Sequence, residues 1–189
     1  MNNYELGKLE ILNSDYNIKS LKTFQGRDGI GINAKLYDGK KKVGFIIDSG
    51  DGGMIDVDFI NEFRGADYQK FDKLIKSLPK YKNIERGFDF KQNEINNFNS
   101  EDVLNTLVDR ELKMRDFKRS MKKVQIFDPI EKTISYYKGS KPSELGQKIR
   151  HKGKPMVWRN ALKSEGYLIL NDLPFNDARD LFKKYALKV

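Results

Sequence analysis

Apolar and polar residues alternate along the first third of the chain, a pattern typical of β-strands that bury one side. Four segments show this pattern: residues 18–24 (IKSLKTF), 30–38 (IGINAKLYD), 40–48 (KKKVGFIID) and 54–60 (MIDVDFI). Glycine- and aspartate-rich segments separate them, and Asp38-Gly39 is a dipeptide typical of a two-residue hairpin turn. The pattern predicts an antiparallel meander with one buried face, which includes Ile30, and one wet face.

Eight of the fifteen glycines lie within residues 26–53, so this stretch could be a phosphate-binding loop. Such a loop follows a strand and opens a helix, whereas GRDGIG at 26–31 is followed by another alternating segment. Neither G-x-G-x-x-G nor G-x-x-x-x-G-K-[ST] is present. We therefore expect turn glycines, with Gly39 at positive φ, whereas Gly31 and Gly44 are expected to mark bulges or close backbone approach.

Helical spacing of apolar residues marks three further segments. The first covers residues 66–78 and stops before Pro79. The second is expected over 101–122, with Ser100 as its N-cap. Its apolar stripe consists of Val103, Leu107, Met114, Phe117 and Met121. The third covers 174–187, with Pro174 near its first position.

The remaining segments give weaker signals. Residues 80–99 are rich in asparagine and predict a loop or a weak strand. Residues 123–128 and 132–139 read as a hairpin around Asp128-Pro129, and 142–150 as a short helix. PMVWRNAL (155–162) and GYLILND (166–172) are strand candidates.

Together these elements predict an α+β fold with three parts in chain order. An N-terminal antiparallel, glycine-punctuated β-meander is followed by a helical middle and by C-terminal β-hairpins with helices. We expect two regions, 1–98 and 99–189, that could pack as one domain. The 189 residues suffice for one ordinary domain or two small ones.

Composition narrows the possible classes of protein. The chain has no cysteine, so disulfides and cysteine-ligated zinc are excluded. No apolar run approaches the roughly 20 residues that span a bilayer, and no basic region followed by an apolar core opens the chain. We therefore expect a cytoplasmic protein with no membrane partner.

Most of the net charge of +9 comes from one part of the chain. Residues 101–159 carry 15 basic and 8 acidic side chains, which gives +7. A basic patch attracts polyanions, either nucleic acid or an acidic protein surface. Two plainer explanations stay open: a solvated lysine-rich face without a partner, and a genomic bias that favours lysine codons.

The basic stretch also contains aromatic residues, which could stack on bases or on a protein surface. Arg115, Arg119 and Lys122 fall within about 60° of one another on the expected helix. A nearly acid-free segment follows them. The candidate partner- or nucleic-acid-binding residues are Arg115, Arg119, Lys122, Lys148, Arg150, Lys152, Lys154, Arg159, Tyr137 and Trp158. The alternative is that the two aromatic residues belong to the core.

Candidates for catalysis are weak. Asp48, Asp51, Asp56 and Asp58 crowd one turn and strand and could hold Mg²⁺ or Ca²⁺, but their spacing is not that of an EF-hand. Aspartates also serve as turn formers and wet-face residues. His151 is the only histidine and is expected to be a surface residue without an orienting carboxylate. We predict no catalytic residue, no metal site and no cofactor.

One segment resembles known proteins. Residues 22–53 contain T-F-x-G-x-D-G, then N-A-x-L-Y-x-x-G-K-K, then I-I-D-x-G-x-G-G. This pattern is similar to that of small uncharacterised bacteriophage proteins. Because such phages encode many small inhibitors of host defence, the resemblance implies an anti-defence role, possible forms of which include anti-CRISPR activity.

The leading hypothesis is a non-enzymatic bacteriophage protein in the host cytoplasm that binds and inhibits a host defence complex, such as an RNA-guided nuclease, through a basic surface. Its partner would be a host defence protein or ribonucleoprotein, contacted through RNA, DNA or an acidic protein patch. The alternative is a nucleic-acid-binding accessory protein of the phage. A third hypothesis is a metal-dependent enzyme that uses the aspartates.

Overall fold

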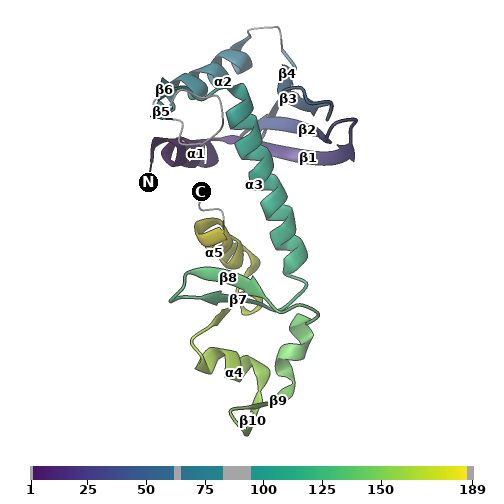
Figure 1. The fold of residues 1–189 in the computed structure, drawn as a ribbon, viewed down its shortest axis with the longest axis vertical. Helices are drawn as coiled ribbons and strands as arrows, with labels where there is room; N and C mark the ends of the chain where they lie inside the picture. Colours follow the sequence, from purple (N-terminus) through teal and green to yellow (C-terminus); the bar gives the residue numbers. More distant parts are fainter. Residues whose placement is uncertain (1, 62–64, 83–94, 187–189) are drawn as a thin grey trace. The chain divides into compact units, whose positions relative to one another are not determined.

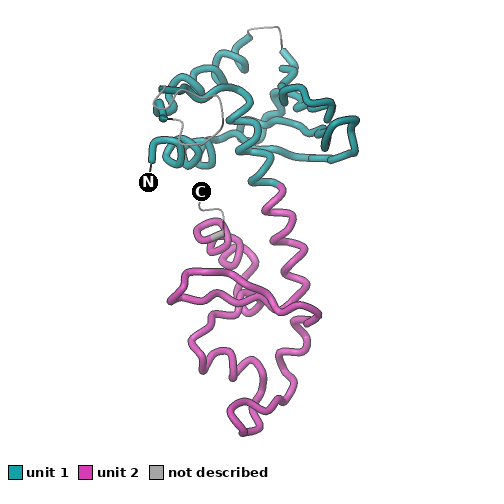
Figure 2. Tube along the Cα trace, viewed as in Figure 1, with its two compact units in different colours: residues 1–111, 189 teal, residues 112–188 magenta. Residues whose placement is uncertain are grey.

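The fold was analysed in a computed structural model that describes residues 2–61, 65–82 and 95–186. The chain divides into two compact units, and the division falls between Glu111 and Leu112 (Figure 2). We call the N-terminal part unit 1 and the C-terminal part unit 2. Helix α3 (Ser100–Ser120) contributes residues to both units, because the division lies within it. The regions expected from the sequence, 1–98 and 99–189, instead divide before this helix begins.

Unit 1 is built on the predicted antiparallel meander (Figure 1). Its strands are β1 (Tyr16–Gln25), β2 (Ile30–Asp38), β3 (Lys41–Asp48) and β4 (Asp56–Phe59), paired in sequence order. The mixture of helices and antiparallel sheets confirms the α+β class.

Helix α2 (Ala66–Ser77) packs on the buried side of this sheet. The Phe71 ring of α2 meets the Tyr16 ring of β1 edge-on at 5.2 Å, and the Phe59 ring of β4 lies 5.7 Å away. The first part of α3 completes the core with fully buried Leu104 and Leu107. Burial of apolar area of this kind stabilises each site by about 1.5–3 kcal/mol per large side chain.

Helix α1 (Asn3–Asn13) is a feature that the sequence pattern did not predict. Its apolar residues form no continuous stripe, but Asn2 and Glu5 form a capping box at its N-terminus. Gly7 lies against the Phe98 ring, only 2.2 Å from where a Cβ would be. The short pair β5 (Tyr81–Lys82) and β6 (Ile95–Asn96) lies in the segment expected as a loop or weak strand. Residues 83–94 of that segment lie outside the described residues.

The glycine-rich stretch forms turns, as predicted, and two of these turns interlock. The amide of Asp28 donates to the carbonyl of Gly50 at 2.9 Å, which joins the β1–β2 turn to the β3–β4 turn. A Cβ at Gly26 would lie 2.6 Å from the Gly50 oxygen, so only glycine fits. Gly44 approaches the Asp58 backbone closely, beside a register shift between β2 and β3. The interlocked turns therefore tie together the ends of two strand pairs in the meander.

The β2–β3 turn confirms one prediction and corrects another. Gly39 has φ of +56°, as expected. Asp38 pairs with Lys41, however, so the two central residues are Gly39 and Lys40 rather than Asp38 and Gly39. Ile30 was expected to be buried but is 65% exposed, because it is paired with Gln25 at the very end of the β1–β2 ladder.

Unit 2 is a smaller α+β assembly. A three-stranded sheet has the order β11-β7-β8, from β7 (Gln125–Asp128), β8 (Thr133–Tyr136) and β11 (Leu168–Ile169). A separate hairpin pairs β9 (Lys148–His151) with β10 (Lys154–Val157). The helical elements are η1 (Pro142–Gly146), α4 (Trp158–Ser164), η2 (Leu170–Asp172) and α5 (Phe175–Ala186).

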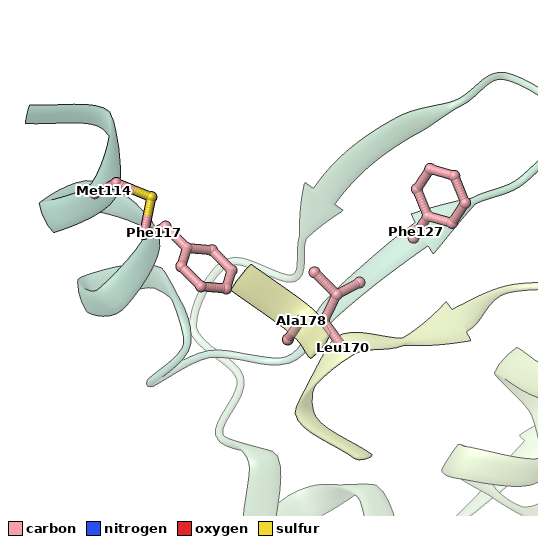
Figure 3. Close-up of a cluster of buried hydrophobic side chains, with 5 residues drawn as sticks. All are labelled: Met114, Phe117, Phe127, Leu170 and Ala178. Atoms are coloured by element: carbon pink, nitrogen blue, oxygen red, sulfur yellow. The ribbon is translucent and has the colours of Figure 1, made fainter. Parts of the chain in front are cut away.

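Two buried clusters hold unit 2 together. In the first, Phe117 points from α3 toward Ala178 and Leu170 (Figure 3), and its ring stacks on that of Phe182 at 4.5 Å. The second consists of Val124, Ile126, Leu145, Leu162 and Ile169. The predicted apolar stripe of α3 is therefore correct, and its C-terminal residues are core residues of unit 2.

Three local predictions for α3 and unit 2 are wrong. Helix α3 is capped by Asn99, which exchanges hydrogen bonds with Asp102, and not by Ser100. The expected helix over 142–150 ends at Gly146, and residues 148–150 belong to β9. The expected strand PMVWRNAL changes to helix α4 at Trp158. Among the described residues, no helix is both long and apolar enough to cross a membrane.

Candidate nucleic-acid interface

The most basic element of the structure is the β9–β10 hairpin. Its two-residue turn consists of Lys152 and Gly153, both at positive φ (48° and 79°), as a type I′ turn requires. The ten residues of the two strands and their turn, 148–157, include four exposed cations and no acidic residue. These cations are Lys148, Arg150, Lys152 and Lys154.

Packing at its base holds the hairpin in place. The Trp158 amide, directly after β10, donates to the carbonyl of Gln147, directly before β9, at 2.9 Å. The Trp158 side chain packs against the second buried cluster. Ile149 and Met156 are partly buried and paired across the strands, whereas Lys148 and Arg150 are exposed. The strand register places Lys154 with His151 on the side of Ile149 and Met156, and Lys148 and Arg150 on the opposite side.

The cations of the hairpin differ from Arg119 and Arg159 in having no carboxylate partner among the described residues, a property that they share with Lys122 and Lys138. Within the ranges that the structure describes, no carboxylate forms an ion pair with Lys148, Arg150, Lys152 or Lys154. A cation without an internal carboxylate remains available for an external anion.

Other predicted binding residues are already engaged inside the protein. Arg159 pairs with Asp172 at 3.1 Å, and Lys163 pairs with the same carboxylate at 3.2 Å. Arg119 pairs with Asp116 at 3.3 Å on α3. Asp116 is three residues from Arg119 in the sequence, and Asp172 is brought to Arg159 by the fold, so each arginine neutralises a carboxylate of the protein itself.

The structure does not bring the predicted basic residues into one cluster. Arg115 is half-buried on α3, Arg119 is exposed there, and Lys122 lies in the turn after the helix. Figure 1 shows β9 and β10 at one end of unit 2, with β7, β8 and α4 between them and the last turns of α3. The hairpin is thus a separate cationic surface.

The two predicted aromatic residues contact each other. The rings of Tyr137 and Trp158 meet edge-on with centroids 5.3 Å apart. Trp158 is a core anchor at the base of the hairpin, whereas Tyr137 is 37% exposed. Burial of part of its ring raises the pKa of Tyr137 above its ordinary value. Of the two, Tyr137 is therefore the one accessible to a ligand.

His151 differs from the expectation that it lacks an orienting carboxylate. Its side chain is 18% exposed, and its Nε2 atom lies 3.5 Å from Oε1 of Glu165. The histidine lies on the same side of the hairpin as Ile149 and Met156, next to Lys152. It links the hairpin to Glu165, the residue that caps α4 at its C-terminus.

The four aspartates considered as metal ligands separate into two pairs. Asp48 accepts the amide of Gly50 at 2.8 Å, and Asp51 accepts the amide of Arg27 at 3.3 Å, so both shape turns. Asp56 and Asp58 are exposed on β4. Within the described part of the chain, no three histidine or acidic side chains are grouped closely enough to hold a metal ion.

Unit 1 also contains a cavity of about 790 Å³ between β4, α2 and the start of α3. Four aromatic residues line it, Phe59, Tyr68, Phe71 and Phe98, together with polar and charged residues. Among the charged residues, Asp72 and Lys76 form an ion pair one helical turn apart. The lining is therefore mixed and contains no histidine or cysteine.

Comparisons of the chain with protein-family models, with curated protein sequences and with solved structures find no match. The resemblance of residues 22–53 to phage proteins therefore stays a prediction, and function must be inferred from the chemistry of the surface.

Proposed function

We propose that this protein acts by binding and that the β9–β10 hairpin contacts the phosphate backbone of a nucleic acid. The observation that carries the proposal is the set of four exposed, unpaired cations on one hairpin, in contrast to the paired Arg119 and Arg159. Phosphate contacts need mobile or forked cations that reach outward, and they need no base-specific geometry. An open two-stranded ribbon with lysines and an arginine meets these needs.

We further propose that the nucleic acid is part of a host ribonucleoprotein, such as an RNA-guided nuclease, and that the protein is a phage-encoded inhibitor of it. The resemblance of residues 22–53 supports this step, and the basic charge of the hairpin is compatible with guide RNA or target DNA as the contact. An accessory protein of phage replication or transcription would use the same chemistry on free nucleic acid.

Charge reversal tests the hairpin directly. The double variant Arg150→Glu/Lys152→Glu is compared with the parent for binding to a labelled DNA duplex across a salt series. Each lost phosphate contact lowers the salt slope by about 0.9, so we expect the slope to fall by about 1.8. Because both side chains are exposed and unpaired, folding should be unaffected, which circular dichroism checks.

A matched control has the same change in net charge elsewhere in the chain. Lys113 and Lys118 are exposed on α3, and Lys113→Glu/Lys118→Glu should leave the salt slope near that of the parent. Equal losses in the two variants would show that net charge, and not the hairpin, controls binding. That result would remove the hairpin as a specific surface.

A pull-down from bacterial lysate, with and without nuclease digestion, separates inhibitor from accessory protein. An inhibitor of a ribonucleoprotein should retain a stoichiometric protein partner after digestion of exposed nucleic acid. An accessory protein should lose its co-purifying material when the nucleic acid is removed.

A further inference from the structure

The solvent-facing side of the meander in unit 1 combines aromatic rings with lysines. The strand register places Phe24 of β1, Tyr37 of β2 and Phe45 of β3 on this side. The lysines on the same face are Lys19, Lys22, Lys35 and Lys42. We call this surface the open face. Exposed aromatic residues on a sheet are informative, because a wet face normally carries polar side chains.

The phenylalanine rings are held in place and still accessible. Phe24 is 40% exposed, and its ring covers Gly31, where a Cβ would lie only 2.3 Å from it. Phe45 is 38% exposed, and the ammonium group of Lys42 lies 4.7 Å from its centroid. Ile47, 51% exposed, lies between the two rings in the strand register.

The spacing of the rings leaves room for more than one base. Phe24 and Phe45 are two strands apart, which corresponds to about 10 Å across the sheet. Phe24 pairs with Gly31 and Phe45 with Lys35, so the rings are also about 14 Å apart along the strands. A duplex keeps its bases stacked inside, so rings at this spacing suit a strand with unpaired bases.

The lysines of the open face have no carboxylate partner among the described residues, although Lys19 and Lys42 lie over the rings of Tyr37 and Phe45 on the same face. Lysines on the other side of the sheet are ion-paired. Lys41 reaches Asp67 at 2.7 Å, and Lys70 pairs with Asp38. In the part of the chain that the structure describes, Lys19, Lys22, Lys35 and Lys42 form no ion pair. Their free charge is complementary to a phosphate backbone.

Charge is also graded across the face. The lysines of β1 and β2 lie on one side, whereas exposed Asp56 and Asp58 border the other side, paired with Ile47 and Phe45. A phosphate backbone is attracted to the lysine side and repelled from the aspartates, which directs the bases toward the ring of Phe45 on β3. An acidic protein partner would gain nothing from the exposed rings beyond apolar contact.

We propose that the open face binds single-stranded nucleic acid, with bases stacked on Phe24 and Phe45 and phosphates on the lysines of β1 and β2. This site is in unit 1 and is separate from the hairpin of the proposed function. Stacking on an aromatic side chain changes affinity by about 5- to 150-fold per base when the ring is removed.

The test uses fluorescently labelled ten-nucleotide oligouridine and oligothymidine, together with a DNA duplex, at low salt. Phe24→Leu/Phe45→Leu keeps apolar cover over the sheet but removes both rings. We expect at least tenfold weaker binding of the single strands and unchanged binding of the duplex. If the ring variant loses binding of oligouridine alone, the site is specific for RNA. If it loses binding of both oligonucleotides, the site accepts single-stranded RNA and DNA.

Phe175→Leu is the matched control, because Phe175 is an exposed ring (46%) on α5 in unit 2. It should leave single-strand binding unchanged. Parent protein that does not bind either single strand, or ring variants that bind as tightly as the parent, would overturn the proposal. Arg150→Glu/Lys152→Glu is measured in parallel: if it leaves duplex binding unchanged, the hairpin proposal fails and the open face is unaffected.

Discussion

The β9–β10 hairpin and the open face of the meander are both cationic, but they are built differently. The hairpin is a two-stranded ribbon whose exposed residues include four cations but no phenylalanine, tyrosine or tryptophan, and its aromatic neighbour Trp158 packs against the core. The open face belongs to a four-stranded sheet and alternates lysines with accessible rings. A phosphate backbone alone can bind the cations of the hairpin. The rings of the open face can be used only by a ligand with unpaired bases that stack on them.

The many lysines of the chain can be divided into those that form an ion pair within the protein and those that do not. Lysine is so abundant here that its frequency indicates little about function. The partner of each side chain is more informative: Lys41 and Lys163 are bound to Asp67 and Asp172, whereas Lys42 and Lys154 are not. Pairing thus distinguishes cations that stabilise the fold from cations that are available to a ligand.

The largest expected effect concerns the glycines that support each surface. Gly50 has φ of +69°, and a Cβ there would lie 2.6 Å from the amide nitrogen of Gly31. Gly153 has φ of +79°, but a Cβ would meet nothing within 4 Å. Gly50→Ala should lower the free energy of unfolding by about 3 kcal/mol, from backbone strain plus the clash, and Gly153→Ala by about 1 kcal/mol from strain alone.

Urea denaturation of the two variants measures this difference, and hydrogen exchange locates it in the meander or in the hairpin. Equal destabilisation would mean that the interlocked turns do not hold the sheet. The open face would then lack the rigid support that distinguishes it from the hairpin.

A smaller effect tests whether paired cations are structural. Asp67 accepts hydrogen bonds from Lys41 at 2.7 and 2.9 Å and from Asn61 at 2.7 Å. Asp67→Asn should lower the free energy of unfolding by about 1 kcal/mol at neutral pH, because charged hydrogen bonds become neutral ones. Lys42→Ala, which removes an unpaired cation, should change the free energy of unfolding by less than about 0.5 kcal/mol.

The same residue gives a pH dependence with a definite sign. The hydrogen bond from Lys41 holds the pKa of Asp67 below its ordinary value. A carboxyl whose pKa is lowered by folding stabilises the protein above its unfolded pKa of about 3.9, and that stabilisation is lost as the pH falls through the folded pKa. Stability of the parent should therefore fall more steeply in acid than that of Asp67→Asn. Parallel curves would contradict this role.

The sequence predicted the meander well because its alternation and its turn glycines agree on the same strands. It did not predict α1, whose apolar residues form no stripe, although Asn2 and Glu5 at capping-box spacing were a usable signal. It also extended a helix from Pro142 through Arg150, because the hairpin signal is only the Lys152-Gly153 dipeptide.

The binding surfaces were harder to predict than the fold. Net charge pointed to the segment that contains the hairpin, but it could not show which cations are paired across the fold, such as Arg159 with Asp172. Strict alternation would place Phe24 on the same face as Ile18 and Phe45 on the same face as Val43, both of which are buried. The register shifts between Lys19 and Lys22 and beside Gly44 turn the two rings to the open face. They were not recognised, since a sequence pattern does not give the register that brings two strands' rings to one face.

The smallest expected effect concerns the acidic border of the open face. Bases directed toward β4 would place their edges near Asp56 and Asp58, which accept hydrogen bonds only. Cytosine presents an amino donor where uracil presents a carbonyl, so the parent should prefer oligocytidine to oligouridine by about two- to fivefold, which corresponds to about 0.5–1 kcal/mol. Under the proposal that the hairpin contacts phosphates alone, the hairpin should contribute no such preference.

Asp56→Asn/Asp58→Asn should abolish the preference while slightly strengthening binding of both oligonucleotides, because two charges that repel phosphate are removed. Competition between the two oligonucleotides measures both effects. A preference that survives in this variant but disappears in Arg150→Glu/Lys152→Glu would mean that the bases are read at the hairpin and not at the open face.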